Sequence, residues 1–137
     1  MVHALQSAKK ILAPDGILIN VHDLPVPHVI ELQADGKTTR AGWLFAEGDF
    51  KIERAAYAAI TQVVLDSQFI LVDEQDFDFR AYTDGLKEFQ DWLAESWDTS
   101  IIPDQTLRRI EEISREALSP VKIILKSPAR MTKLRMV

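Results

Sequence analysis

The chain has 137 residues, 47% of them hydrophobic and 27% charged, a balance typical of an ordinary folded domain and not of a disordered chain. It contains no cysteine, which excludes disulfides, thiolate nucleophiles and cysteine-type zinc sites. No stretch has the flanks of a signal peptide or the apolar length of a membrane span, so we expect a cytoplasmic protein with no membrane partner.

The net charge of −5 is unevenly spread along the chain. Acids dominate from Asp66 to Asp98, whereas Lys126 to Val137 carries only bases. Nucleic acid is therefore not an expected partner. The basic segment at the end either touches a phosphate or is a solvated terminus that balances the acidic surface.

The first predicted elements are a helix and a buried strand. Ala4, Leu5, Ala8, Ile11 and Leu12 recur at helical spacing. The turn Pro14-Asp15-Gly16 follows, and the apolar run from Ile17 to Val21 then predicts a strand buried on both faces.

A β-hairpin is predicted next. The prolines between His22 and His28 favour an extended connector, because proline restricts itself and the residue before it. Asp35-Gly36 then separates two β-prone runs, 29–33 and 38–45, which is a strong short-range hairpin signal, and we expect about five residues per strand.

The remaining pattern predicts three helices and two strands. Helices are expected from Asp49 to Asp66, from Thr83 or Asp84 to Trp97, and from Pro103 to Leu118. Strands are expected from Phe69 to about Phe79 and from Val121 to Lys126. We therefore predict a single α/β domain over residues 1–128, with a small mixed β-sheet flanked by helices, and a basic flexible tail over 129–137.

The segment from Ala4 to Asp23, with its helix, L-x-P-x-G turn and apolar strand, resembles the fifth-strand region of class I S-adenosylmethionine-dependent methyltransferases. The resemblance covers nearly the whole chain in element order, as the carboxyl-terminal half of that Rossmann-like fold with an inserted β-hairpin. It implies that Ile17 to Val21 is the family's fifth strand and Phe69 to Phe79 its sixth. It also implies that Val121 to Lys126 is the last strand, folded back antiparallel between those two.

The half of the family's domain that holds S-adenosylmethionine has no counterpart here. The family binds the cofactor with a glycine-rich loop after its first strand and an acidic residue closing its second, whereas the five glycines of this chain contain no G-x-G pair. A glycine loop is needed because the backbone must approach the ligand closely. We therefore expect no cofactor binding or methyl transfer by this chain alone, and no cofactor-binding residues in it.

The missing half leaves a predicted edge. In the intact fold the fourth strand covers the fifth, so here Ile17 to Val21 is expected to be a bare apolar edge, which is a template for pairing with another chain. The expected partner is a second copy of the chain, giving a dimer, or a separately encoded amino-terminal half.

Candidate site residues follow the first predicted strand. His22, Asp23 and His28 lie at its carboxyl end, where open α/β sheets place ligands, and they could coordinate a metal, transfer protons or simply make turn hydrogen bonds. Their spacing matches no metal motif. The acids at 73, 74, 76 and 78 suit either a divalent cation or a solvated strand face.

Aromatic residues, among them Trp43 and Tyr82, line either a substrate pocket or the core. The substrate-binding candidates are thus His22, Asp23, Trp43 and Tyr82. Two functions remain open. The chain is either the substrate-side half of a methyltransferase or a non-catalytic binding or assembly module that self-associates through its strand edge.

Overall fold

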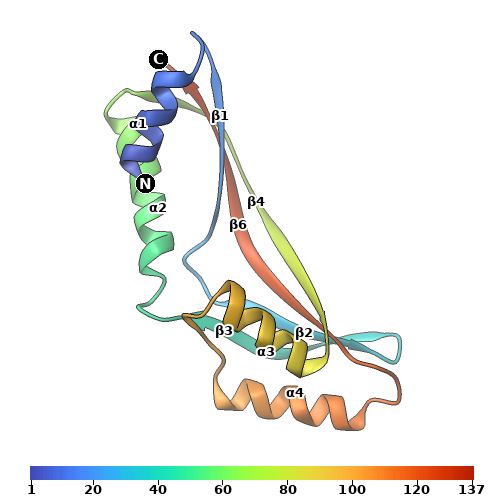
Figure 1. Ribbon diagram of the computed structural model, residues 1–137. Helices are drawn as coiled ribbons and strands as arrows, with labels where there is room; N and C mark the ends of the chain where they lie inside the picture. The colour runs from blue at the N-terminus through green and yellow to red at the C-terminus, as the bar shows by residue number, and fades with distance from the viewer. The chain divides into compact units, whose positions relative to one another are not determined.

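The structure is a computed structural model that describes residues 1–137 and contains four helices and a six-stranded antiparallel sheet (Figure 1). The helices are α1 (Val2–Ile11), α2 (Lys51–Leu65), α3 (Gly85–Ser96) and α4 (Asp104–Glu116). The strands are β1 (Ile17–Asp23), β2 (His28–Ala34), β3 (Lys37–Ala46), β4 (Phe69–Asp84), β5 (Ser100–Ile101) and β6 (Lys122–Met136). None of the helices combines the length and the apolar character needed to cross a membrane.

The chain divides into two compact units. Unit 1 comprises Met1–Pro25, Lys51–Phe77 and Pro128–Val137, and unit 2 comprises Val26–Phe50 and Asp78–Ser127. Strands β4 and β6 contribute residues to both units.

Unit 1 is built on the antiparallel pair of β1 and the second half of β6, in which Ile17 lies opposite Arg135 and Asp23 opposite Ala129. Helix α2 contacts both α1 and β1. Small residues on the buried stripe of α2, including Ala56 and Ala59, allow this close approach. The core of the unit consists of Leu5, Ala59, Ile60, Val63, Phe69 and Leu134.

Unit 2 is built on the predicted hairpin. Strands β2 and β3 pair antiparallel, and Asp35 (φ 52°) and Gly36 (φ 73°) supply the two left-handed residues that a tight hairpin turn needs. The first half of β6 pairs with the other edge of β2, from Val29 opposite Lys126 to Gln33 opposite Lys122. Helices α3 and α4 complete the core, which consists of Ile30, Leu32, Leu44, Phe89, Leu93, Ile110, Ile123 and Leu125.

A β-bulge interrupts the hairpin where helix α4 packs. The register shifts between Ile30, opposite Gly42, and Glu31, opposite Arg40, so Ala41 is the extra residue. Gly42 faces α4 so closely that a Cβ there would lie 2.2 Å from Thr106 Oγ1. Only glycine fits this contact without a shift of α4 or β3.

Four expectations from the sequence differ from the structure. Strand β1 was expected to be buried on both faces, but its residues alternate between exposed and half-buried, and Ile17, Ile19 and Val21 are exposed. The sheet is antiparallel, so the prediction of a mixed sheet is wrong, because β2 and β3 form a hairpin and β6 runs antiparallel to both β1 and β2. Residues 129–136, expected as a flexible tail, form the second half of β6 and bury Ala129, Thr132 and Leu134. Strand β5 was not predicted, since its two residues carry no pattern.

Candidate functional site

A polar cluster lies in unit 1 around the carboxyl end of β1. Its members come from four elements: Asn20 and His22 from β1, Tyr57 from α2, Glu74 and Asp76 from β4, and Arg130 from β6. His22 and Arg130 are directly opposite each other in the β1–β6 pair, which explains why these two meet.

The His22 ring is held by a neighbour on its own strand. Asn20 Nδ2 lies 2.8 Å from His22 Nδ1, and since an amide nitrogen only donates, Nδ1 accepts this hydrogen bond. The neutral ring then carries its proton on Nε2, which is buried and has no hydrogen-bond partner. The ring also lies near that of Tyr57, with centroids 6.4 Å apart.

Arg130 is the electrostatic centre of the cluster. Its guanidinium donates two hydrogen bonds to the Asp76 carboxylate, at 2.6 and 3.0 Å, and lies 2.9 Å from Glu74 Oε1. The same group lies over the Tyr57 ring, 5.5 Å from its centroid. Such a bidentate contact links β4 to β6, and the guanidinium that makes it is less available to bind a ligand.

These contacts shift the proton affinities of the cluster. Burial, and then the nearby Arg130 charge, lower the pKa of His22, so the imidazole is neutral at neutral pH. The hydrogen bonds from Arg130 lower the pKa of Asp76 and, in return, the pKa of Arg130 is raised. The cluster therefore presents one neutral imidazole, with an unused N–H donor, beside a satisfied ion pair.

Asp23 follows His22 at the end of β1. Burial raises the pKa of its carboxyl group, and the neighbouring His22 opposes this shift. Asp23 and His22 are consecutive residues at the end of a strand, each with a group that could contact a polar ligand or exchange a proton with it.

His28 does not join this cluster. It is fully buried in unit 2, where its Nδ1 lies 2.7 Å from Ser127 Oγ and its ring lies between those of Phe50 and Trp97. It is a core histidine, and a packing role explains it.

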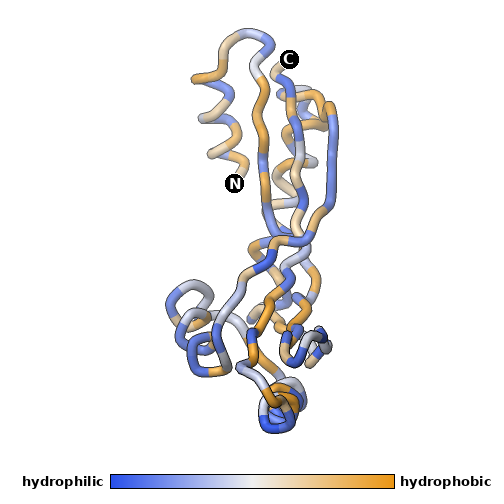
Figure 2. Tube along the Cα trace, turned by 90° about the vertical axis from the view of Figure 1, so that its right-hand side faces the viewer, coloured by the Kyte–Doolittle hydropathy of each residue, from blue (hydrophilic) through white to orange (hydrophobic).

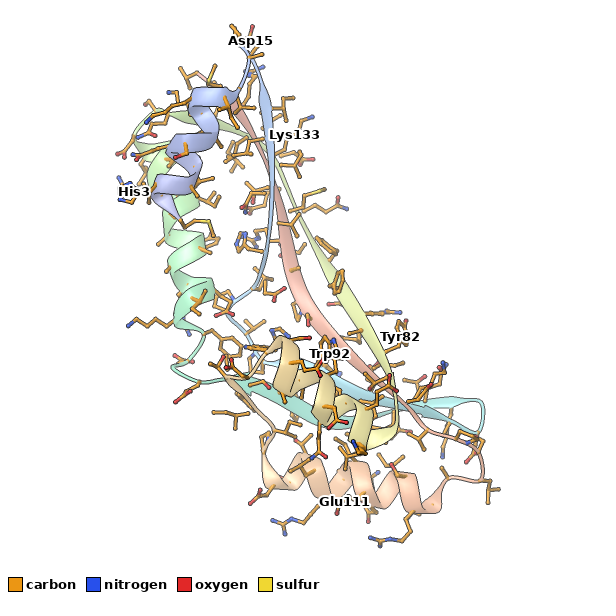
Figure 3. All side chains as sticks on the ribbon, viewed as in Figure 1. His3, Asp15, Tyr82, Trp92, Glu111 and Lys133 are labelled. Atoms are coloured by element: carbon orange, nitrogen blue, oxygen red, sulfur yellow. The ribbon has the colours of Figure 1, made fainter.

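The two aromatic candidates also belong to unit 2. Trp43 on β3 and Tyr82 on β4 are exposed, at 45% and 54% of their surface. Figure 3 labels Tyr82 on β4. Trp43 borders a concave surface between β3 and α4.

The acidic row of β4 is paired with cations of β6. In unit 1 Glu74 and Asp76 bind Arg130, and in unit 2 Asp78 lies 3.7 Å from Lys126 Nζ. No group of three or more histidine, aspartate or glutamate side chains is placed to hold a metal ion. A paired strand face therefore accounts for the row.

Sequence reasoning missed Arg130, because it lay in the expected tail. Its contacts to Asp76 are separated by 54 positions in the chain, and no local pattern announces such a pairing.

The chain matches no family model, no curated protein and no solved structure.

Proposed function

We propose that this chain is the substrate-side half of an S-adenosylmethionine-dependent methyltransferase, which acts only when a cofactor-binding half completes its sheet. The observation that carries this proposal is the position of β6. It pairs with both β1 and β4, and so lies between them. This is the order that the methyltransferase resemblance implies for the fifth, last and sixth strands.

The helices of unit 1 support the same assignment. Helix α1 precedes β1, α2 lies between β1 and β4 in the chain, and α2 contacts both α1 and β1. In a Rossmann-like half, helices that precede and follow a strand cover one face of the sheet in this way. The hairpin of β2 and β3 is then an insertion between the fifth strand and its following helix.

The outer edge of β1 is the proposed site of completion. Strand β1 ends the sheet order, and Ile17, Ile19 and Val21 are 47%, 51% and 55% exposed. Figure 2 shows the hydrophobic run along this strand. An apolar strand with one unpaired edge favours pairing with a second copy or with a separately encoded half.

The residues present do not form a site for S-adenosylmethionine. The carboxyl end of β1 carries His22 and Asp23 and no glycine at which the backbone could approach a ligand closely. The cofactor therefore belongs to the completing half. In the completed enzyme His22 and Asp23, the candidates that lie in unit 1, contact the methyl acceptor.

A non-catalytic assembly module is the second candidate function. The absence of a cofactor site and the apolar edge of β1 favour it equally well. The two functions differ in one respect: a methyltransferase half requires a partner gene encoding a strand followed by a G-x-G loop, and a module that only assembles does not.

Native mass spectrometry of the purified chain, with and without S-adenosylmethionine, tests this proposal. We expect a dimer with no cofactor adduct, which Ile19→Lys at the β1 edge dissociates. The control Ile52→Lys, on an exposed site of α2, leaves the dimer intact. A strict monomer at micromolar concentration would exclude pairing of two copies through this edge, and a stoichiometric adduct would show that the chain holds the cofactor itself.

Coexpression with the encoded partner half then separates the two functions. We expect methyl transfer by the pair and none by either half, and loss of that activity in His22→Ala. A pair that assembles and binds cofactor but transfers no methyl group to any acceptor tested would favour the assembly module.

A further inference from the structure

Unit 2 contains a groove that the proposed function does not use. It runs between the outer edge of β3 and helix α4 and has a volume of about 840 Å³, within the range of ligand sites. We propose that this groove binds an acidic peptide segment of a partner protein, in an extended conformation that adds a strand to β3. The proposal depends on unit 2 alone and stands apart from the methyltransferase assignment.

The outer edge of β3 is available for strand addition. Its inner edge pairs with β2 over the whole hairpin, but its outer edge pairs only through Phe45 and Ala46, with β5. No backbone hydrogen bond to a turn or loop involves residues 37–44. The alternate N–H and C=O groups of this segment that point away from β2 are therefore free for a peptide backbone.

The groove follows this edge and does not lie over one face of the sheet. Four consecutive residues of β3, 40–43, line it together with Phe45. Gly42 points toward α4, whereas Trp43 points the other way and is exposed. A surface that includes both orientations lies along the strand edge, where an added strand would lie.

The charges lining the groove oppose the charge of the whole protein. Four arginines and two glutamates line it, although the chain as a whole carries a net charge of −5. Arg109 and Glu112 are ion-paired with each other, while no ion pair engages Arg108 or Arg115. These two arginines lie seven positions apart on α4, along the same side of the helix, and face the groove. A carboxylate-bearing ligand is the complementary occupant.

The size of the groove fits a short extended peptide. Helix α4 has 13 residues and is about 20 Å long, which is the length of about six residues of extended chain. Trp43 and Phe45, both exposed, provide apolar contacts for side chains on one face of such a strand, and Arg40 lies over the Trp43 ring at 5.7 Å. A small anion would use the arginines but neither the strand edge nor this length.

The test uses the full chain and an acetylated, amidated hexapeptide of alternating glutamate and valine. Fluorescence anisotropy of a labelled copy measures its affinity, and amide chemical shifts of the 15N-labelled protein locate it. We expect saturable binding, with the largest shifts at residues 38–44 and along α4.

Two changes in the peptide distinguish the contribution of strand pairing to binding from the contribution of charge. Methylation of the valine backbone nitrogens removes their hydrogen-bond donors and is expected to weaken binding at least about tenfold. Replacement of glutamate by lysine is expected to abolish binding. Free glutamate at the same carboxylate concentration is expected to compete only weakly.

The protein variant Arg108→Glu/Arg115→Glu is expected to bind the peptide at least about tenfold more weakly, because it reverses two exposed charges of the groove. Arg80→Glu, a reversal on an exposed residue of β4 outside the groove, is the matched control and leaves the affinity unchanged. Unchanged circular dichroism of both variants shows that they fold.

Five results would overturn the proposal. Four of them are no saturable binding at millimolar peptide, equal binding of the lysine peptide, equal binding of the N-methylated peptide, and tighter binding of a uridine oligomer than of the acidic peptide. Equal competition by free glutamate would instead assign the groove to a small anion and would likewise refute a peptide site.

Discussion

Leu134→Ala distinguishes a structured carboxyl-terminal strand from a frayed terminus. Leu134 is fully buried in the core of unit 1, directly opposite Leu18 of β1 in the strand register. The substitution removes about three methylene equivalents, each worth ~0.8 kcal/mol when buried. The cavity left behind adds to this loss, so we expect a fall of about 3 kcal/mol in the free energy of unfolding.

Urea denaturation followed by far-ultraviolet circular dichroism measures this loss. Tryptophan fluorescence is unsuitable as the reporter, because Trp43, Trp92 and Trp97 all belong to unit 2. Val137→Ala is the matched control, since Val137 is 64% exposed at the end of the same strand, and we expect it to change stability by less than about 0.5 kcal/mol. An equally small loss for Leu134→Ala would refute the packing of this segment into the core.

Three further predictions follow from single contacts. Gly42→Ala is expected to destabilise the protein by about 1–3 kcal/mol because its Cβ would clash with Thr106, and Thr106→Ala in the same chain should recover part of the loss in a double-mutant cycle. NMR titration is expected to give His22 a pKa below its ordinary value of 6.5. The folded state then binds the proton less readily than the unfolded state, so the stability contributed by neutral His22 is lost as the pH falls below about 6.5. This dependence of the unfolding free energy on pH should disappear in His22→Gln. The pKa of Asp35, lowered first by the Leu118 N–H and then by the Ser119 hydroxyl, is expected to rise in Ser119→Ala by NMR titration, and an unchanged value would exclude that contact.

The elements that form through residues close together in the sequence could be predicted from the sequence. The Asp35-Gly36 turn specifies its hairpin because both residues readily adopt left-handed conformations. The stripe of small and apolar residues on α2 likewise predicted its buried face, since helical periodicity is a property of the segment itself.

The carboxyl-terminal half of β6 depended on distant partners and was missed. Ser127 and Pro128 read as the end of a strand, yet the Pro128 carbonyl accepts a hydrogen bond from the Leu24 N–H at 2.8 Å and the strand continues. The bases Lys133 and Arg135 suggested a solvated tail, although they alternate with the buried Thr132 and Leu134. A half-buried strand with cations on its outer face was the correct interpretation.

The candidate site was also predictable only in part. The position of His22 at the end of a strand was predictable, because strand ends are visible in the sequence. Its neutral state was not, since that state depends on burial and on Arg130, which the fold brings from the far end of the chain. The groove of unit 2 could not be predicted either, because the sequence does not show which edge of β3 lacks a partner strand.

The pairing of β6 also bears on how the chain is made. The partner of β1 and the second partner of β2 are both supplied by β6, which is synthesised after them, with Ile17 opposite Arg135 and Gln33 opposite Lys122. Such distant pairings slow folding, and the nascent chain exposes the apolar β1 on both of its edges until β6 has been made. A truncation before residue 129 would make that transient state permanent, and we expect the product to aggregate.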